Sequence, residues 1–333
     1  EALQLKPERY DCLLQLAVSH LTLMHHDIAE KYLNEYLEHP TEKIDEINAL
    51  MTLSGLHKAR GDSKRSIEVA KEAVEKHPEV SENFSNALLD MVYSDEVSQE
   101  EMFEWCKKYA QYYEAPYQSF TPDFSNTSIP NRKLRIGYVS ADFFNHSVSY
   151  FALPLVCNHN KELFEVYTYA VRDYTGVVSA QYKKNSHWVS LVGMNEQDVC
   201  DRIKADKIDI LIDLAGHTGG NQLRVFAKRA APVQATWLGY PFTTGLSNMD
   251  YRIVDAIVEP EGLAEHLSTE KLIRIPGTFC AYRPSIGAPE RLLTGELDVR
   301  TTPAKLNGYV TFGCCNNIAK LTDFTLAMWA RIM

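Results

Sequence analysis

The sequence predicts an α-helical repeat region followed by an α/β domain with a mostly parallel, doubly wound sheet. Three observations lead to this prediction: helical positions recur at a fixed spacing in the first third of the chain, short apolar runs alternate with helical stretches in the middle, and polar residues follow several of those runs. We predict repeats over residues 1–117, a linker over 118–132, the α/β domain over 133–285 and the beginning of a further domain over 300–333.

Two copies of one spacing indicate the helical repeats. The first copy consists of Leu13, Leu16, Ala17, His20, Ala29, Leu33 and Tyr36, and the second, 37 residues later, of Leu50, Leu53, Ser54, His57, Ser66, Ala70 and Ala73. This is the tetratricopeptide period of about 34 residues with a short insertion. It predicts pairs of helices, with small residues where the second helix of a pair crosses the first.

Helix-ending residues support these units. His39-Pro40 and His77-Pro78 end the two copies, and the sequence RGD at 60–62 supplies the turn between two helices. A third, less regular unit ends near Pro116, and Ser98 begins its second helix as part of a capping box. Repeats of this kind either form a peptide-binding groove or act as a helical cap that supports the next domain.

The α/β domain is indicated by seven apolar runs that read as strands. They cover 134–140, 164–171, 187–192, 208–216, 233–239, 251–258 and 271–276. Strands this uniformly apolar are covered on both faces, which is typical of a parallel sheet. Helices fit between them over 147–159 and 195–207, and the alternation predicts a doubly wound fold.

Polar side chains follow three of the predicted strands. They are Asp142, Asn145 and His146 after the first strand, His217 and Thr218 with two glycines after the fourth, and Gly239, Tyr240, Pro241, Phe242 and Thr243 after the fifth. Ligands of such sheets bind beyond the carboxyl ends of the strands. We therefore predict a binding or catalytic site along this edge.

The type of chemistry is narrowed by motifs that are missing from the sequence. There is no GxGxxG turn, no GxxxxGK[ST] loop and no GxSxG elbow. Asp142 and His146 have the chemistry of a general base and its orienting group. The alternative is structural: Asn145 or Ser147 caps the following helix, Asp142 favours the positive helix end, and His217 is satisfied within its loop.

Composition excludes several other classes of protein. The chain has 333 residues, 45% of them hydrophobic and 23% charged, and a net charge of -10, which argues against a general nucleic-acid binder. No apolar run is long enough to span a membrane and no signal pattern begins the chain, so we expect a cytoplasmic protein. The seven scattered cysteines indicate reduced thiols. His20, His25, His26 and His57 lack partners at ligand spacing, and we expect no metal site.

Five stretches in order carry a resemblance to a known family. They are LRIGYVSADFFNHSVSYF, KIDILIDLAGHTGGNQL, APVQATWLGYPFTTGL, MDYRIVDAIVEP and GYVTFGCCNNIAKLT. With the repeats included, nearly the whole chain resembles the SPINDLY / O-linked N-acetylglucosamine transferase family. These are GT41-like protein O-glycosyltransferases with N-terminal tetratricopeptide repeats.

The resemblance implies a GT-B architecture, in which two Rossmann-like domains face a cleft and the nucleotide sugar binds mostly to the second. It implies inverting transfer to Ser or Thr of protein acceptors, with acceptors bound through the repeats and with no metal or other cofactor. Lysine, helix N-termini and backbone N–H groups stabilise the leaving diphosphate. It implies neither a nucleic-acid partner nor a membrane partner.

The resemblance also assigns roles to residues. His146 matches the active-site histidine and Asp142 the acid of the same turn, with Asn145 and Ser147 beside them. His217 matches a loop position that the SPINDLY branch fills with histidine, and Thr218 follows it. The GYPFTTG loop over 239–245 matches the loop that lines the sugar side of the cleft.

Two departures from the family pattern concern the donor. Ser147-Val148 stands where animal members carry Pro-Thr, and Phe242 is larger than its counterparts. We expect transfer of N-acetylglucosamine from UDP-N-acetylglucosamine. The alternatives are fucose transfer from GDP-fucose, as in plant SPINDLY proteins, a GT-B enzyme with a small-molecule or carbohydrate acceptor, and a non-catalytic repeat scaffold.

The end of the chain matches the first strand, turn and helix of the second Rossmann domain. The resemblance makes Asn317 and Lys320 candidates for the cleft, and the alternative for Lys320 is an exposed lysine at a helix start. Most of the nucleotide-binding half is missing, so we expect this chain alone to bind donor poorly and to turn over little.

Overall fold

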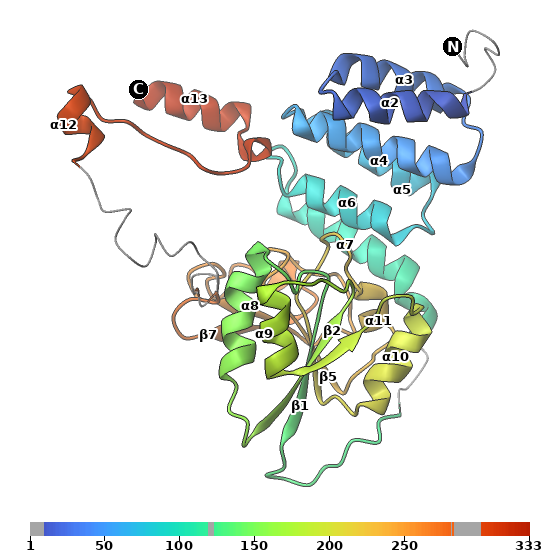
Figure 1. Ribbon diagram of the computed structural model, residues 1–333, viewed down its shortest axis with the longest axis vertical. Coiled ribbons are helices and arrows are strands. Elements are labelled where there is room, and N and C mark those ends of the chain that lie inside the picture. The colour runs from blue at the N-terminus through green and yellow to red at the C-terminus, as the bar shows by residue number, and fades with distance from the viewer. Residues whose placement is uncertain (1–9, 119–122, 281, 283–300) are drawn as a thin grey trace. The chain divides into compact units, whose positions relative to one another are not determined.

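A computed structural model describes residues 10–118, 123–280, 282 and 301–333 of the chain. The chain divides into two compact units, residues 1–112 with 317–333, and residues 113–316. Each is described by itself (Figure 1). Residues 1–9 of the predicted repeats, residues 119–122 of the predicted linker and the predicted boundaries at 285 and 300 lie outside the described residues.

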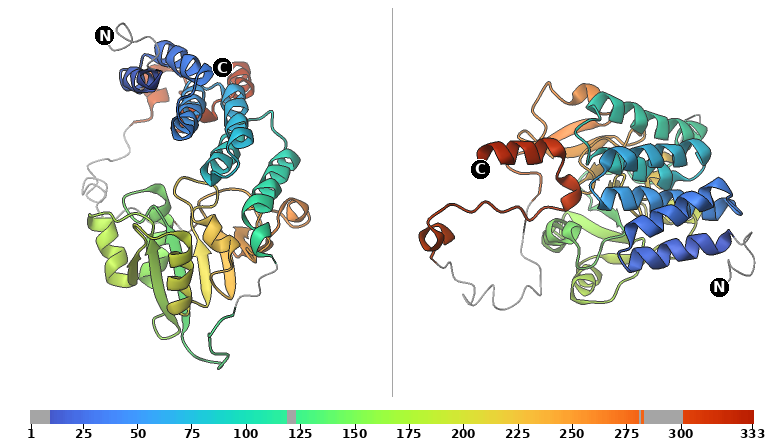
Figure 2. Two further views of the ribbon diagram at one scale, coloured as in Figure 1. Left: turned by 90° about the vertical axis from the view of Figure 1, so that its right-hand side faces the viewer. Right: turned by 90° about the horizontal axis from the view of Figure 1, so that it is seen from above.

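The first unit contains helices that follow one another in antiparallel order (Figures 1 and 2). Their bounds are α2 Asp11–Thr22, α3 His26–Glu38, α4 Lys43–Ala59, α5 Ser63–Lys76, α6 Ser81–Met91 and α7 Gln99–Tyr113. The small residues Ala29, Ser66 and Ala70 are buried, as the spacing predicts, whereas Leu16 and His20 are partly exposed. The paired helices of the prediction are therefore present.

The turn and the N-caps that the sequence predicts are present at the ends of these helices. Gly61 has φ +80°, which suits the turn between α4 and α5. The Asp62 carboxylate then caps α5 by accepting from the Arg65 N–H at 3.0 Å. Ser98 caps α7 in the same way, since its Oγ accepts from the Glu101 N–H at 3.1 Å.

A buried acid ties three of these helices together. Asp90 of α6 accepts from the hydroxyls of Ser54 at 2.7 Å and Ser66 at 2.9 Å, and its other oxygen binds the Lys58 ammonium at 2.6 Å. Ser54 and Lys58 lie on α4 and Ser66 on α5. The contacts fix the crossing of α4, α5 and α6 where only small side chains separate the backbones.

The second unit contains a seven-stranded sheet. Its strands are β1 Leu134–Ser140, β2 Phe164–Ala170, β3 His187–Ser190, β4 Ile210–Asp213, β5 Val233–Trp237, β6 Tyr251–Asp255 and β7 Lys271–Ile275. The order is β3-β2-β1-β4-β5-β6-β7 and every pair is parallel. Each strand lies within a predicted apolar run, so the predicted parallel sheet is confirmed.

Helices connect these strands. They are α8 Ser147–Asn158, α9 Val177–Asn185, α10 Glu196–Ala205 and α11 Leu223–Ala227, with a short 3₁₀ turn at Glu265–Leu267. A further 3₁₀ turn at Ala115–Tyr117 precedes β1. Helices α8 and α9 pack on one face of the sheet, where Val148, Ala152 and Tyr182 meet Ile136 and Tyr138 of β1. Helices α10 and α11 contact each other.

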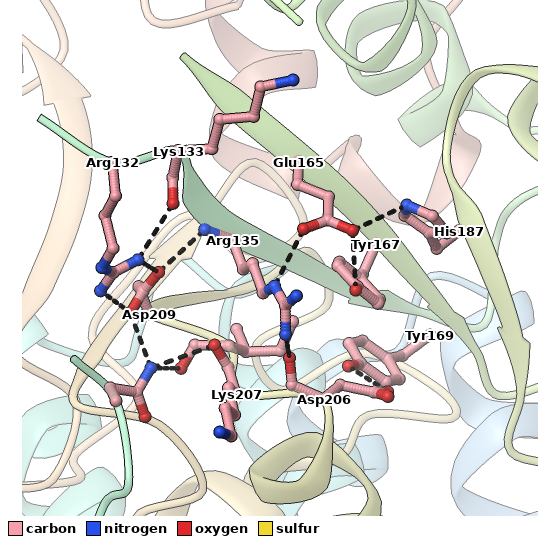
Figure 3. Close-up of polar contacts among 12 residues, drawn as sticks. Arg132, Lys133, Arg135, Glu165, Tyr167, Tyr169, His187, Asp206, Lys207 and Asp209 are labelled. Atoms are coloured by element: carbon pink, nitrogen blue, oxygen red, sulfur yellow. Dashed lines mark hydrogen bonds and ion pairs between the residues drawn. The ribbon is translucent and has the colours of Figure 1, made fainter. Parts of the chain in front are cut away.

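An ionic network holds the linker to the amino end of the sheet (Figure 3). Asp209 immediately precedes β4, and its two oxygens bind the Arg132 guanidinium at 2.6 Å each. The same carboxylate accepts from the Asn126 side chain at 2.6 Å and from the Arg135 N–H at 2.9 Å. Linker, β1 and β4 are therefore joined through one acid.

A second set of ion pairs joins β1 to β2 and β2 to β3. Arg135 donates to Glu165 of β2 at 2.9 Å, and the other oxygen of Glu165 lies 3.0 Å from the His187 Nε2 (Figure 3). The amino ends of β1, β2 and β3 are thus linked side by side. The charges at this edge are largely matched within the network.

The C-terminal segment departs in part from the prediction. It contains α12 Pro303–Asn307, a 3₁₀ turn Ile318–Lys320 and α13 Asp323–Ile332, so the predicted helix forms. The strand predicted from the sequence GYVTFGC is wrong: Tyr309 and Phe312 are exposed, and no described strand pairs with this stretch. A strand needs a partner for its backbone hydrogen bonds, which local sequence does not supply.

We expect Asp209→Asn to lower the free energy of unfolding by about 2 kcal/mol, because it removes the charge that pairs with Arg132. Burial alone would raise the pKa of Asp209, but the hydrogen bonds from Arg132, the Arg135 N–H and Asn126 outweigh it and hold the pKa below its usual value. The contribution is therefore present at neutral pH and lost as pH falls through that lowered pKa. Urea unfolding of the wild type and of Asp209→Asn at pH 7 and below pH 4 measures the difference in their free energies of unfolding. A difference that is larger below pH 4 than at pH 7 would contradict the expectation.

Candidate active site

The strand order of the sheet reverses between β1 and β4. From β1 the chain moves outward to β2 and β3, and it then returns to place β4 on the other side of β1. Connections that leave two such neighbouring strands diverge, and ligands of sheets with this strand order bind beyond the carboxyl ends at that point. The turn over 141–146 and the loop over 214–222 flank this position.

The turn after β1 leads directly into α8. The predicted cap, Asn145 or Ser147, is wrong: His146 is the cap, and its Nδ1 accepts from the Val148 N–H at 3.3 Å. The reason is the extended backbone at residue 146, with φ −138° and ψ 158°, which places this side chain beside the first free N–H groups. Asn145 and Ser147 are exposed.

Asp142 lies beside this imidazole. Its Oδ2 is 3.7 Å from the His146 Nδ1, and 15% of the Asp142 side chain and 39% of the His146 side chain are exposed. Two hydrogen bonds fix the Asp142 backbone, because its N–H donates to Ser140 Oγ at 2.9 Å and its carbonyl accepts from Ser149 Oγ at 2.9 Å. The site therefore pairs a firmly held acid with an imidazole that a ligand can reach.

Two protonation arrangements fit these contacts. A His146 Nδ1 that accepts from Val148 leaves the ring proton on Nε2. An Nδ1–H that faces Asp142 instead leaves Nε2 as an acceptor, which is the form of a general base. Burial raises the pKa of Asp142, whereas the charges of His146 and Arg172 act in the opposite direction.

Arg172 and Tyr174 join the site, although the sequence analysis did not single them out. They follow β2, and the Arg172 Nη1 lies 3.5 Å from the Tyr174 hydroxyl. The Tyr174 ring packs on Phe144 at 4.2 Å between centroids, and Phe144 in turn lies beside the His146 ring. The signal was available, since the sequence VRDYTG is another polar stretch at the end of a strand.

Asp213 ends β4 as a fully buried acid, and it too escaped the sequence analysis. Its oxygens accept from the N–H groups of Ala215 at 3.1 Å and Gly216 at 2.7 Å, and from the Thr236 hydroxyl at 2.8 Å. Burial raises its pKa, and these hydrogen bonds oppose the increase. Asp213 therefore fastens the start of the β4 loop to β5.

His217 is fully buried within that loop, which is the structural alternative raised by the sequence. Its Nε2–H donates to the Thr244 carbonyl at 2.9 Å, and its ring meets Tyr240 edge-on at 5.4 Å. Burial lowers the pKa of His217 to about 4, with the bond to Thr244 acting against it. The imidazole is therefore neutral at pH 7 and stands behind the surface of the site.

Two glycines allow the β4 and β5 loops to touch. Gly216 has φ +53°, and a Cβ there would lie 2.3 Å from the Tyr240 Cβ. A Cβ on Gly239 would lie 2.2 Å from the Leu214 carbonyl oxygen. Both distances exclude any larger residue unless the backbone moves.

The other predicted site residues lie in the β4 and β5 loops and in the C-terminal segment. In the β5 loop Pro241 is exposed and Phe242 half-buried, whereas Thr243 is fully buried and its hydroxyl donates to Glu270 at 2.6 Å. Thr218 is half-buried and donates to the Ala215 carbonyl at 2.8 Å. Asn317 and Lys320 belong to the first compact unit, where both are exposed.

The part of the chain that the structure describes contains neither a metal-binding cluster nor a membrane-spanning helix. Among these residues, no group of three or more His, Cys, Asp and Glu side chains is arranged to hold a metal ion. None of the described helices combines the length and the apolar character needed to cross a membrane.

The parallel sheet and the acid–imidazole turn at its switch point define a Rossmann-like α/β domain with a site at its carboxyl edge. Residues 104–284, more than half of the chain, match the profile of glycosyl transferase family 41. The chain belongs to glycosyl transferase family 41.

Relatives of known description support this assignment. A protein described as a probable UDP-N-acetylglucosamine–peptide N-acetylglucosaminyltransferase SPINDLY from Solanum lycopersicum is 40% identical over 259 residues, which cover 74% of this chain and 26% of that protein. A UDP-N-acetylglucosamine–peptide N-acetylglucosaminyltransferase from Caenorhabditis elegans is 41% identical over 152 residues, or 44% of this chain and 13% of that protein. The chain thus spans about a quarter of the SPINDLY relative.

A solved structure resembles the chain along nearly all of its length. It is a mutant O-GlcNAc transferase from Thermobaculum terrenum, with a TM-score of 0.83 and 28% identity. The match covers 99% of this chain and 60% of that one.

We expect His217→Gln to flatten the pH dependence of stability, because glutamine can donate to the Thr244 carbonyl but does not titrate. The native pKa of about 4 lies below the ordinary 6.5, so the unfolded chain binds more protons between these values. The contribution of His217 is full above pH 6.5 and falls by up to about 3 kcal/mol as pH drops toward 4. Urea unfolding between pH 7 and 4.5 measures the slope, and equal slopes in both proteins would contradict the expectation.

Proposed function

We propose that the protein containing this chain is a protein O-glycosyltransferase that transfers N-acetylglucosamine from UDP-N-acetylglucosamine to Ser or Thr of protein acceptors with inversion. One observation carries the proposal: the Asp142–His146 pair stands at the switch point of a family 41 domain. The relatives described above as UDP-N-acetylglucosamine–peptide N-acetylglucosaminyltransferases support the donor and the acceptor class.

In this reaction the acceptor hydroxyl oxygen bonds to the anomeric carbon as the bond from that carbon to the diphosphate breaks. The diphosphate leaves with the electron pair, and the hydroxyl gives up its proton. We propose that His146 accepts that proton on Nε2 when its Nδ1–H faces Asp142, and the 3.7 Å between the His146 Nδ1 and the Asp142 Oδ2 supports this role. Asp142 then balances the charge of the imidazolium, as the acid does in other acid–histidine pairs.

The surrounding residues are proposed to bind the sugar and the acceptor. Asn145 and Ser147 are exposed beside His146, and Thr218, Gly239, Tyr240, Pro241 and Phe242 belong to the two loops that meet at this edge. His217 and Thr243 are proposed to act from behind, because both are fully buried. The charge of Arg172 is proposed to oppose, together with that of His146, the increase in the Asp142 pKa that burial causes.

The architecture proposed for the whole protein is that of a GT-B enzyme with N-terminal tetratricopeptide repeats. We propose repeats over 1–117, a linker over 118–132, the first Rossmann-like domain over 133–285 and the start of the nucleotide-binding domain over 300–333, with Asn317 and Lys320 serving the cleft. The helix pairs and the parallel sheet support this division. We further propose a cytoplasmic enzyme that binds its acceptors through the repeats and needs no metal or other cofactor.

The role of His146 predicts that His146→Ala lowers kcat for transfer in the full-length protein by about 10²–10⁴-fold, since the base is lost. Asp142→Asn should lower it less, because the imidazole remains but loses its charge partner. Transfer of radiolabelled sugar to an acceptor protein measures both variants.

His187→Ala provides the matched control. His187 forms an imidazole–carboxylate pair with Glu165 at 3.0 Å, at the opposite end of the same sheet. We expect this variant to keep transfer within about twofold of wild type. Full transfer by His146→Ala would overturn the role assigned to His146.

The donor is tested separately. We expect the full-length wild-type protein to transfer sugar from UDP-N-acetylglucosamine and not from GDP-fucose when both are supplied at equal concentration. Mass spectrometry of the acceptor distinguishes the two products by mass. Fucose on the acceptor would reject the proposed donor and keep the glycosyltransferase class, whereas no product from either donor would reject the class.

A further inference from the structure

Glu270 forms hydrogen bonds with the β5 loop, and it lies outside every sequence motif discussed above. It lies immediately before β7 and is only 4% exposed. Its Oε2 accepts from the hydroxyls of Thr243 at 2.6 Å and Ser268 at 2.8 Å. Its Oε1 accepts from both the N–H, at 2.7 Å, and the hydroxyl of Thr244.

The choice of an acid at this position is informative. Within the described part of the chain, Glu270 forms no ion pair with a lysine, arginine or histidine, and burying such a carboxylate carries a desolvation cost. A carboxylate can only accept hydrogen bonds, so the hydroxyls of Thr243 and Thr244 must both donate to it. Glu270 therefore fixes the direction of each hydroxyl and the backbone turn between them.

Thr244 passes this constraint to the β4 loop. The side chain and N–H of Thr244 bind Glu270, while its carbonyl accepts the Nε2–H of His217 at 2.9 Å. That bond sets the tautomer and the orientation of a buried ring. The β4 loop is therefore anchored, through one residue, to a loop that lies about 27 positions further along the chain.

The β4 loop in turn lies against the turn that carries Asp142. A Cβ on Gly220 would lie 2.9 Å from the Ala141 Cβ and 3.7 Å from the Arg172 Nη2. Gly220 also has φ +76°, so it tolerates little side-chain bulk. Gly220 lies three residues after His217, so a short backbone segment joins the anchored imidazole to this contact.

We propose that Glu270 is a positioning residue of the site: it fixes the Thr243–Thr244 turn and, through the Thr244 carbonyl and His217, holds the loop over 215–220 against the Asp142 turn. The catalytic consequence rests on the proposed glycosyltransferase function. The structural relay from Glu270 to the β4 loop does not.

The experiment compares two variants of the full-length protein with a matched control. Glu270→Gln keeps the shape but replaces one acceptor oxygen with an amide donor, which faces hydroxyl and N–H donors. Thr244→Val keeps the volume and the carbonyl but removes one hydroxyl, so it tests the same relay if the first variant folds poorly. Asp209→Asn is the control, because it removes a similarly buried carboxylate whose hydrogen-bond partners, Asn126, Arg132 and the Arg135 N–H, lie in the linker and at the start of β1.

Hydrogen–deuterium exchange and transfer kinetics provide two independent measurements. We expect Glu270→Gln to increase exchange in peptides over 215–220 as well as over 243–246, and to lower kcat at least tenfold with less than a threefold change in the donor KM. Thr244→Val should change both in the same direction by a smaller factor. Asp209→Asn should destabilise the protein while leaving kcat within about twofold and exchange over 215–220 unchanged.

Each outcome decides one part of the proposal. Increased exchange confined to 243–246 and 268–272, with kcat within twofold of the control, would show a local structural role and overturn the proposal. If the wild-type protein transfers no sugar, the proposed function fails, and exchange over 215–220 alone then supports or overturns the relay.

Discussion

The segments that follow β4 and β5 carry backbone N–H groups that donate to buried carboxylates. The geometry of the candidate site depends on these hydrogen bonds. Asp213 binds the N–H groups of Ala215 and Gly216, and Glu270 binds that of Thr244. Glu114 does the same further along, where it accepts from the N–H groups of Ser247 at 2.8 Å and Asn248 at 2.6 Å. Loops fixed in this way can approach one another closely enough to require glycine at 216 and 239.

The carboxylates around the sheet differ in the kind of partner that they bind. At the amino end, Asp209 and Glu165 are matched by arginine guanidinium groups, so the charges there serve mainly to join the linker and the strands. At the carboxyl end, Asp213 binds neutral hydroxyl and N–H donors. Glu270, which precedes β7, binds the same kinds of donor in the β5 loop. Asp142 differs from both groups because it is partly exposed: burial raises its pKa, and the charges of His146 and of the exposed Arg172 oppose the increase.

The cap bond of His146 and its proposed role as a base compete for the same nitrogen. Its Nδ1 caps α8 by accepting from Val148, yet a base at Nε2 requires a proton on Nδ1 facing Asp142. The Val148 nitrogen is 3.3 Å and the Asp142 Oδ2 is 3.7 Å from the same Nδ1, which pairs with the Val148 N–H when unprotonated and with the carboxylate when protonated. A helix start is thereby built into the proposed proton transfer.

Sequence alone determined the helix pairs and the seven parallel strands, and it predicted the edge of the sheet for the candidate site, because periodicity and strand-end polarity are local patterns. Only the tertiary structure decided that His217 and Thr243 are buried and that Glu270 accepts from the Thr243 hydroxyl. It also left the stretch at 308–313 without a strand partner. Which polar side chain faces outward depends on strand register and on the close contact of two loops, and both arise between residues far apart in the chain.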